Sequence, residues 1–497
     1  MTLAQRAGVD TRARQAACTA LMARVAQAQE QGLQQLRLIW ADLHGTLRGK
    51  TLVLGEDAAA LHSALQSALN EGVGLVSTMF LKDTSDRTAF KVFEPGALSA
   101  LTGFSSANNA LLLPDPASFR VLPWASDTAW LRADALWADG SPVLADPRQL
   151  LLRALDHLSQ AGYGLQCGLE VEFHIYRITD DGLATEQAAW PTEPPAVRLV
   201  HPGYQLLGDT WADLAHEPLA IVRHTALGLG LPLRSLEIEL GPSQVEAVFA
   251  PTDALTAADH MVMFRNGVRQ ALRRAGFHAS FVCKPPLPNA VASGWHLHQS
   301  LVDAAGGNAM QRLASAGAAD DARQVLSDTG VHWLAGLLHH ASGMAALCAP
   351  TIPAYDRFQG SLMAPQAAHW GRDNRGALLR VLGAPQDPAT RIENRLGEPM
   401  ANPHLMIAAQ IWAGLDGLQR KLEPGPATQD PYAGAAPALP GSLSQALDAL
   451  AANPVLQQGL GPVMASVFEA VKRQELKRFA AATDPLQWQR CEYFARF

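Results

Sequence analysis

One spacing of polar side chains constrains the fold of this chain more than any other feature. In the run Ser293–Leu301, the residues His296, His298 and Ser300 alternate with apolar residues such as Trp295. Because successive side chains of a β-strand point to opposite faces, these three polar groups share one face and Trp295 lies on the other. The same spacing recurs in three further strand-like runs: Glu170–Glu172, Glu237–Glu239 and Arg391–Arg395. A lone His-x-His pair is most often a surface or core feature, but four such runs predict strands whose polar faces form one site.

Length and composition exclude several classes of protein. At 497 residues the chain exceeds one ordinary core, so we expect two domains or one large domain with an appendage. Hydrophobic residues at 48% and charged residues at 17% are typical of a soluble globular protein. The formal net charge is -7 and no Lys/Arg block is present, so neither a nucleic-acid nor a membrane partner is expected. A small-molecule substrate fits better.

The cysteines and the N-terminal segment indicate a cytoplasmic protein. The five cysteines are scattered and never form a Cys-x-x-Cys pair, which argues against a disulfide framework and against structural zinc. The first 35 residues are rich in Ala and Gln, with Arg at 6, 12, 14 and 24, and lack the continuous apolar core of a secretion signal. We expect them to form an amphipathic helix; an Arg-rich transit peptide is the alternative.

Turn and helix signals divide the chain into three parts. Residues 36–52 predict two short strands around a turn at His44-Gly45. A helix over 56–71 and strand-like pieces near 73–80, 111–113 and 119–122 follow. A second domain opens near Asp146-Pro147, because Pro147 is well placed in the first turn of a helix. We therefore predict an α+β protein with a helical extension over 1–35, a small domain over 36–140 and a larger domain over 141–497.

Both strand-like and helix-like periodicities occur in the larger domain. The expected strands are 165–178, two over 236–249 with a break at Gly241-Pro242, 293–301, 377–382 and 391–395. The expected helices are one from Pro147, 214–229, 253–275, a pair over 323–346, one starting at Asn402-Pro403, and those of 443–497. The stretches 179–201 and 349–370 are expected to be loops.

The acidic residues of these strands predict a metal site. Five carboxylates gathered around a core cannot all stay ionised unless cations offset them. Carboxylate-rich ligands with a single imidazole suit Mg²⁺ or Mn²⁺ better than zinc. The candidate ligands are Glu170, Glu172, Glu239, Glu246, Glu393 and His296.

Arginines in and near these strands predict a site for phosphate and carboxylate groups. Guanidinium matches both groups with two parallel hydrogen bonds. The sequence contains neither a Gly-x-x-x-x-Gly-Lys-Ser/Thr loop nor a Gly-x-Gly-x-x-Gly turn between strand and helix, so metals and arginines must bind any nucleotide. The arginines are Arg357, Arg375, Arg380, Arg391 and Arg395.

From about residue 36 to the C-terminus, the order of the motifs resembles the glutamine synthetase family. The run Glu170-Val171-Glu172-Phe173 resembles the first metal strand of the family, and Glu239–Glu246 resembles its second carboxylate pair. Ser293–Leu301 is similar to the signature Gly-Ser-Gly-Met-His-x-His-x-Ser-Leu, with Trp295 in place of Met. Motifs at 370–375, 391–395 and 401–405 complete the ordered set.

The resemblance implies a β-grasp-like N-terminal domain and a larger catalytic domain whose curved antiparallel strands form a two-metal funnel. It implies a homo-oligomer of stacked rings, a dodecamer, in which the small domain completes the site of a neighbour. It also implies ATP and two or three Mg²⁺ or Mn²⁺ ions as cofactors, with glutamate and an amine as substrates. ATP would first convert the carboxylate into an acyl phosphate, which the amine then attacks.

The resemblance also assigns roles to single residues. One metal would be held by Glu172, Glu239 and Glu246, and the other by Glu170, His296 and Glu393. ATP would contact His298, Ser300, Arg380 and Arg391. Glutamate would be held by Glu172, His296, Arg357 and Arg395, and the catalytic residues would be Arg395, on the reacting carboxylate, and Arg375, on the transferring phosphoryl group.

Three departures from the family pattern concern the substrates. Val291-Ala292 replace an Asn-Gly that helps to hold glutamate. Met363, in the run Ser361–Pro365, stands where a flap glutamate is usual, and Gly74–Thr78 lack the ammonium-binding aspartate. Ammonium needs carboxylates to bind it and to take its proton. An apolar, deformable Met363 therefore favours a bulky uncharged amine at this position.

These residues look most like the γ-glutamylanilide synthase type within the family, which would join glutamate to an aromatic amine and serve aromatic amine degradation. The alternatives are an alkylamine, ethanolamine or polyamine ligase, and a glutamine synthetase with an altered amine site. A catalytically idle ring protein is the non-enzymatic hypothesis. The intact ligand set argues against that hypothesis, because a retired site has no need of so many buried charges.

Overall fold

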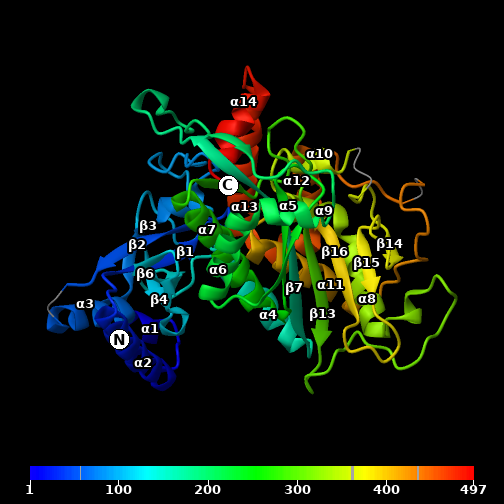
Figure 1. Ribbon diagram of the computed structural model, residues 1–497. Helices are drawn as coiled ribbons and strands as arrows, with labels where there is room; N and C mark the ends of the chain where they lie inside the picture. The colour runs from blue at the N-terminus through cyan, green and yellow to red at the C-terminus, as the bar shows by residue number, and fades with distance from the viewer. Residues whose placement is uncertain (56–57, 360–362, 434–435) are drawn as a thin grey trace.

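The computed structural model describes residues 1–55, 58–359, 363–433 and 436–497. Within these residues there are two main β-sheets, one of six strands and one of ten. Figure 1 shows the first sheet and the N-terminal helices on one side of the molecule and the second sheet on the other, with helix α7 (Ala254–Arg274) between them. No helix in the described ranges is long and apolar enough to span a membrane.

The first sheet, called here the N-terminal sheet, combines one parallel pair of strands with antiparallel neighbours. β1 pairs in parallel with the long strand β6, and the order is β2-β1-β6-β4-β3, with β5 also on β6. Its strands are β1 (Gln35–Ala41), β2 (Leu47–Val53), β3 (Val73–Val76), β4 (Asn109–Pro114), β5 (Arg120–Leu122) and β6 (Ala125–Leu136).

The two faces of the N-terminal sheet pack against different layers. Leu36, Leu38 and Leu131 form one apolar cluster with Leu21 of helix α2 (Thr11–Glu30) and with helix α3 (Ala58–Glu71). Ile39 and Trp130 point the other way, because neighbouring residues of a strand alternate between faces. They belong to the main core, which they share with α7.

The second sheet is curved, and its order is β14-β15-β16-β13-β7-β10-β9. Its long strand β7 also pairs with β8, β11 and β12. All pairs are antiparallel except that of β14 with β15. The strands are β7 (Gly164–Asp180), β8 (Ala196–Leu199), β9 (Leu233–Ile238), β10 (Gln244–Phe249), β11 (Thr252–Asp253), β12 (Phe277–Ser280), β13 (Trp295–Val302), β14 (Trp370–Arg372), β15 (Leu379–Leu382) and β16 (Arg391–Gly397).

Helices cover one face of the second sheet and leave the other for polar residues. Gln299 of β13 donates to Gln410 Oε1 at 3.2 Å and accepts from Trp333 Nε1 at 2.9 Å. These contacts join the face that carries Trp295 to helices α8 and α11. The helices are α4 (Pro147–Gln160), α5 (Asp209–Leu214), α6 (His216–Gly228), α8 (Asp328–His339), α9 (Ala341–Cys348), α10 (Ala354–Arg357), α11 (Pro403–Arg420), α12 (Leu443–Ala451), α13 (Pro454–Ala480) and α14 (Pro485–Gln489), besides α1 (Leu3–Arg6) at the N-terminus.

The structure confirms the α+β class and the curved antiparallel sheet, and it corrects several elements. The sequence analysis missed β6, because this strand is buried along most of its length and lacks a clear alternation. It also missed β12 and β14, and it assigned β8 to a loop. The helix expected over 214–229 is α6, and the short helix α5 before it was missed. The strand-like piece near 73–80 is strand β3 followed by a 3₁₀ turn from Ser77. The domain boundaries at 36 and 141 stay predictions.

Gly336 of α8 and Gly417 of α11 allow these two helices to approach closely, and replacing Gly336 should destabilise the fold. A Cβ added at Gly336 would lie 2.2 Å from the Ala413 carbonyl oxygen. We expect Gly336→Ala to lower the free energy of unfolding by about 1–3 kcal/mol, measured by urea unfolding, because the helices must separate. Gly55→Ala is the control, since its added Cβ meets no atom within 4 Å. Equal stability of the two variants would contradict this packing.

Candidate active site

Strand register brings the predicted acidic residues together on the face that the helices leave free. Glu172 of β7 lies opposite Glu246 of β10, and Glu170 lies opposite His296 of β13. Directly opposite residues of an antiparallel pair have Cβ atoms roughly 4.5–5.5 Å apart, so like charges here repel strongly. Glu239 follows the end of β9 beside them.

Two histidines hold the Glu170 carboxylate between them. His296 Nδ1 is 2.9 Å from Glu170 Oε1, and His298 Nε2 is 3.0 Å from Glu170 Oε2. His296 also lies 3.8 Å from carboxylate oxygens of both Glu172 and Glu393. One imidazole therefore stands among three carboxylates.

Burial and mutual repulsion change the proton affinity of this acidic cluster. Burial, followed by the charges of Glu170 and Glu172, raises the pKa of Glu246 to about 10. Burial and then the charge of Glu239 raise the pKa of Glu172 to about 7, and burial raises the pKa of Glu239 as well. Burial alone would also raise the pKa of Glu170, but its hydrogen bonds with the two histidines hold it well below its usual range. The cluster thus needs protons or other cations to offset its charge.

Two arginines clamp the carboxylate of Glu393, which is fully buried on β16. Arg395 Nη1 donates to Glu393 Oε1 at 2.6 Å, and Arg380 Nη1 donates to Glu393 Oε2 at 3.0 Å. Arg380 Nε also donates to Asp373 at 3.0 Å. Burial alone would raise the pKa of Glu393, but the charges of His296 and then Arg395 hold it below its usual range.

Two further arginines lie against the histidines. Arg357 is buried at the end of α10, where it donates to the carbonyl oxygens of Arg395 and Gly397 at 3.1 Å. Its Nη2 lies 3.5 Å from His296 Nε2. Arg391 Nε lies 3.1 Å from His298 Nδ1. The site therefore has cations along the edge formed by β16 and an acidic centre.

Three of the predicted residues lie at the margin of this network. Arg375 is exposed between β14 and β15, and no hydrogen bond or ion pair to it is found in the described part of the chain. Ser300 is partly buried on the same face of β13 as His298. Met363 is 55% exposed, and its carbonyl oxygen accepts from Arg395 Nη2 at 3.3 Å. Ser361 and Leu362, in the same run, lie outside the described residues.

The donor set fits divalent metal ions. Two groups of side chains each bring their ligand atoms within 4.8 Å of one another: Glu170, Glu246 and His296, and Glu170, His298 and Glu393. Carboxylates with few imidazoles are the donors that Mg²⁺ and Mn²⁺ prefer. In this conformation Glu170 belongs to both groups, whereas Glu172 and Glu239 lie beside them. Which ligand holds which ion stays a prediction.

The sequence analysis missed the groups that hold Glu172 in place. The backbone N–H of Gly294 donates to Glu172 Oε2 at 2.9 Å, and Gln244 Nε2 donates to the same oxygen at 3.2 Å. Gln244 Nε2 also lies 3.0 Å from Ser293 Oγ. Gln244 precedes Glu246 by two residues on β10, so the strand spacing could have placed it on the site. Nothing in the local sequence pairs Asp373 with Arg380.

Comparison with known proteins assigns this site to a family. The model of the glutamine synthetase catalytic domain matches residues 144–491. The chain belongs to the glutamine synthetase family. It is accordingly an ATP-dependent carbon–nitrogen ligase that joins glutamate to an amine.

Similar proteins within the glutamine synthetase family act on different amines, as their names state. The chain is 36% identical to γ-glutamylanilide synthase of Acinetobacter sp, over 95% of this chain and 94% of that one. It is 34% identical to γ-glutamylethanolamide synthetase of Streptomyces coelicolor, over 74% and 76% of the two chains. A solved structure of GmaS with ADP has a TM-score of 0.73 and 28% identity, covering 94% of this chain and 97% of that one.

The proton held by Glu246 predicts how stability depends on pH in this glutamine synthetase family member. In the metal-free protein Glu246 stays protonated well above its usual pKa of 4.5. The folded state then binds more protons than the unfolded state, so the free energy of unfolding falls as pH rises. We expect a fall of up to about 1.4 kcal/mol per pH unit between about pH 7 and pH 8.5, measured by urea unfolding.

This pH window separates Glu246 from other titrating groups. Burial lowers the pKa of His296 to about 4, which gives a slope of opposite sign only at lower pH. Buried thiols such as Cys348, whose pKa burial raises to about 12, act only at higher pH. Glu246→Gln should remove most of the slope, and saturating Mg²⁺ or Mn²⁺ should remove it in the native sequence. The same slope in Glu246→Gln would contradict the assignment.

Gly294 is expected to be essential for space as well as for its N–H. A Cβ added at Gly294 would lie 2.6 Å from Arg357 Nη2 and 2.7 Å from His296 Nε2. We expect Gly294→Ala to displace His296 and to weaken Mn²⁺ binding by about 10- to 100-fold, measured by calorimetric titration. Gly55→Ala should bind Mn²⁺ as tightly as the native protein. Unchanged binding in Gly294→Ala would show that His296 is no ligand.

Proposed function

We propose that this enzyme joins the γ-carboxyl group of glutamate to a neutral, weakly basic aromatic amine, such as aniline, through γ-glutamyl phosphate. The observation that carries the proposal is the half-exposed Met363, which stands where an ammonia-using member would carry a glutamate. The 36% identity to γ-glutamylanilide synthase over 489 residues supports the same substrate class.

The proposed reaction has two steps. A carboxylate is a poor electrophile, so ATP transfers its terminal phosphoryl group to the γ-carboxylate of glutamate, with ADP as the leaving group. The amine nitrogen then attacks the acyl carbon, phosphate leaves and the nitrogen loses a proton. Two or three bound Mg²⁺ or Mn²⁺ ions would neutralise the charge between the carboxylate and the triphosphate. The chain contributes mainly positioning and charge.

The proposed roles rest on the family pattern, and the grouping of these side chains on one face supports them. The metal ligands are Glu170, Glu172, Glu239, Glu246, His296 and Glu393; the ATP contacts are His298, Ser300, Arg380 and Arg391. Arg357 and Arg395 hold glutamate, with Arg395 on the reacting carboxylate. Arg395 Nε is buried without a hydrogen-bond partner among the described residues, so it has a donor to offer. Arg375, exposed between β14 and β15, is proposed to face the transferring phosphoryl group.

The acidic cluster has an apolar border on the side of Glu239. Leu240 follows it directly and is 43% exposed. Tyr204, also exposed, donates its backbone N–H to the Leu240 carbonyl at 2.7 Å. Val291 contacts Gly241, where an added Cβ would lie 2.8 Å from the valine Cβ. Aromatic rings pack well on tyrosine, aliphatic and thioether groups, which suits an arylamine better than ammonium.

The N-terminal sheet can contribute to such a site only in an assembly of several copies. Val76 and Ser77, where ammonia-using members carry an aspartate, end strand β3. Figure 1 shows β3 on the far side of α7 from the second sheet. We therefore propose a cytoplasmic homo-oligomer of stacked rings, a dodecamer, in which this segment meets the site of a neighbour. Light scattering measures its mass.

A panel of amines tests the substrate class. Product formation is followed by mass spectrometry and phosphate release, with glutamate, ATP and Mg²⁺ or Mn²⁺ held constant. We expect kcat/KM to be highest for aniline, lower for ethanolamine and isopropylamine, and lowest for putrescine and ammonia. A preference for ethanolamine would support the second candidate, which the relative from Streptomyces coelicolor favours. A preference for ammonia or putrescine would contradict the proposal.

The same panel with Met363→Glu tests the residue that carries the proposal. A carboxylate there should bind ammonium and take its proton, so activity with ammonia should rise and activity with aniline should fall. Leu486→Glu is the matched control, because Leu486 is 52% exposed on α14 and receives the same charge change. A Met363→Glu enzyme with an unchanged amine preference would contradict a role for this residue.

A further inference from the structure

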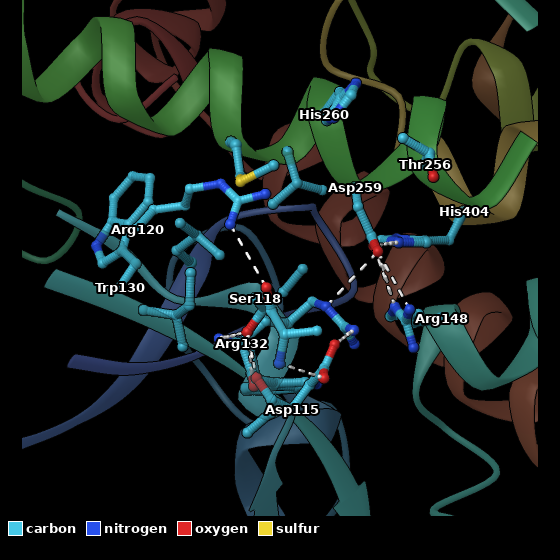
Figure 2. A pocket seen from close by; sticks show the side chains of 18 of the residues that line it. Asp115, Ser118, Arg120, Trp130, Arg132, Arg148, Thr256, Asp259, His260 and His404 are labelled. Carbon is cyan, nitrogen blue, oxygen red and sulfur yellow. Dashed lines mark hydrogen bonds and ion pairs between the residues drawn. The ribbon is translucent and has the colours of Figure 1, made fainter. Parts of the chain in front are cut away.

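A partly open cavity of about 220 Å³ lies between the N-terminal sheet and α7. Figure 2 shows Trp130 and Arg132 of the sheet below α7, which carries Thr256, Asp259 and His260. Among the described residues that line this cavity, none belongs to the proposed active site. Water occupies about 30 Å³ per molecule, so the cavity could hold roughly seven waters or one small organic molecule. It is too small for ATP.

Two of the three arginines that line the cavity already have carboxylate partners. Arg132 Nη1 lies 3.0 Å from Asp134, and Arg148 Nη1 lies 2.8 Å from the same carboxylate. Arg148 also lies 3.1 Å from Asp259, which accepts from His404 Nε2 at 2.9 Å. These ion pairs connect the N-terminal sheet to α4, α7 and α11. With Asp115, which also pairs with Arg132, three carboxylates offset these two arginines, so neither needs a ligand to offset its charge.

Arg120 differs from these two arginines. Its Nη1 donates to the backbone carbonyls of Phe119 at 2.9 Å and Ala117 at 3.5 Å. No carboxylate lies within 4.0 Å of it in the described ranges, and its Nε and Nη2 donate to no described residue. Figure 2 shows its side chain extending under α7 from the side of Trp130. A half-buried guanidinium with free donors is a site for an anion.

The walls around Arg120 suit an anion with an apolar body. Trp130, Met263 and Leu47 contribute apolar surface to the cavity. Thr256 and His260, one helical turn apart on α7, add polar groups that make no side-chain hydrogen bond with the described residues. A packing defect would be lined by aliphatic groups alone. This cavity instead combines a flat aromatic wall, a free cation and unused hydrogen-bonding groups.

We propose that this cavity is a second ligand site, which binds a small aromatic carboxylate with its carboxylate on Arg120 and its ring against Trp130. Such a ligand bridges β5 and β6 of the N-terminal sheet to α7. It therefore favours the packing of these elements and stabilises the folded protein by RT ln(1 + L/Kd), where L is the free ligand concentration. The inference is independent of the amine that the active site uses.

Calorimetric titration of the full-length protein with benzoate tests the proposal. Saturating glutamate and ADP are present, so that the active site is not free to bind the probe. We expect one benzoate per chain, a rise in Tm, and clearly weaker binding of the neutral analogue benzamide and of inorganic phosphate. Diffraction from crystals soaked in 4-bromobenzoate should place the bromine between Trp130 and α7.

Three variants make the test specific. Arg120→Gln keeps a donor for the Phe119 carbonyl but removes the charge, and should weaken benzoate binding by about 10- to 100-fold. Ala133→Leu fills the cavity from β6 and should abolish binding. Arg24→Ala is the control. Arg24 also donates to the Phe119 carbonyl, at 3.0 Å, but lies outside the cavity lining, so this substitution removes the same charge without changing the site. Its affinity should stay near the native value.

The proposal would be overturned by an absence of benzoate binding at millimolar concentration. It would equally be overturned by native affinity in Arg120→Gln, by phosphate or benzamide binding as tightly as benzoate, or by bromine density elsewhere only. A finding that the enzyme does not use aniline would contradict the proposed function but would not affect the results expected for benzoate binding.

Discussion

The packing of carboxylates against one another on a buried sheet face is the interaction on which the rest of the structure depends. The antiparallel register places Glu172 opposite Glu246. Two buried carboxylates in this arrangement repel each other and have lost most of the hydration that would stabilise their charges. The cost of this arrangement is offset by the charges of Arg357 and Arg395 near Glu172 and by a proton on Glu246. A divalent ion can take the place of that proton. The acidic cluster thus has the donor atoms and the excess negative charge that suit a divalent ion.

The opposite face of the same sheet makes this arrangement possible. Trp295 and Gln299 face α8 and α11, where the close contact at Gly336 fixes the helical layer. A strand that is held rigidly on one face can carry repelling groups on the other without tilting. The alternation of apolar and polar residues in β13 therefore serves two purposes, since it builds the core and it positions the ligands.

The sequence could predict on which face of a strand a side chain lies, but not which side chain of another element it contacts. Alternation placed His296, His298 and Ser300 on one face of β13 and the acidic residues on theirs, because the period of a strand is fixed by covalent geometry. It could not predict that Arg380 would hold Glu393, or that Gly294 would bind Glu172, because these contacts depend on register and on close backbone approach. β6 escaped prediction for a related reason: a strand buried on both faces loses its alternation. Arg120 and Arg132 look alike in sequence, and only packing shows that one is paired and the other is not.

The choice of amine can be understood from where charge is allowed in this site. The carboxylates of the acidic cluster already interact with histidine, arginine and backbone N–H groups. The residues proposed to border the cluster, Leu240, Val291 and Met363, are apolar. Ammonium arriving there would have to give up its hydration without a carboxylate to replace it. An arylamine loses little on entering, since it is neutral and its ring gains contact area. Under the proposed function, the cost of burying charge would select the amine, and a single carboxylate at position 363 would be the smallest change that reverses that cost.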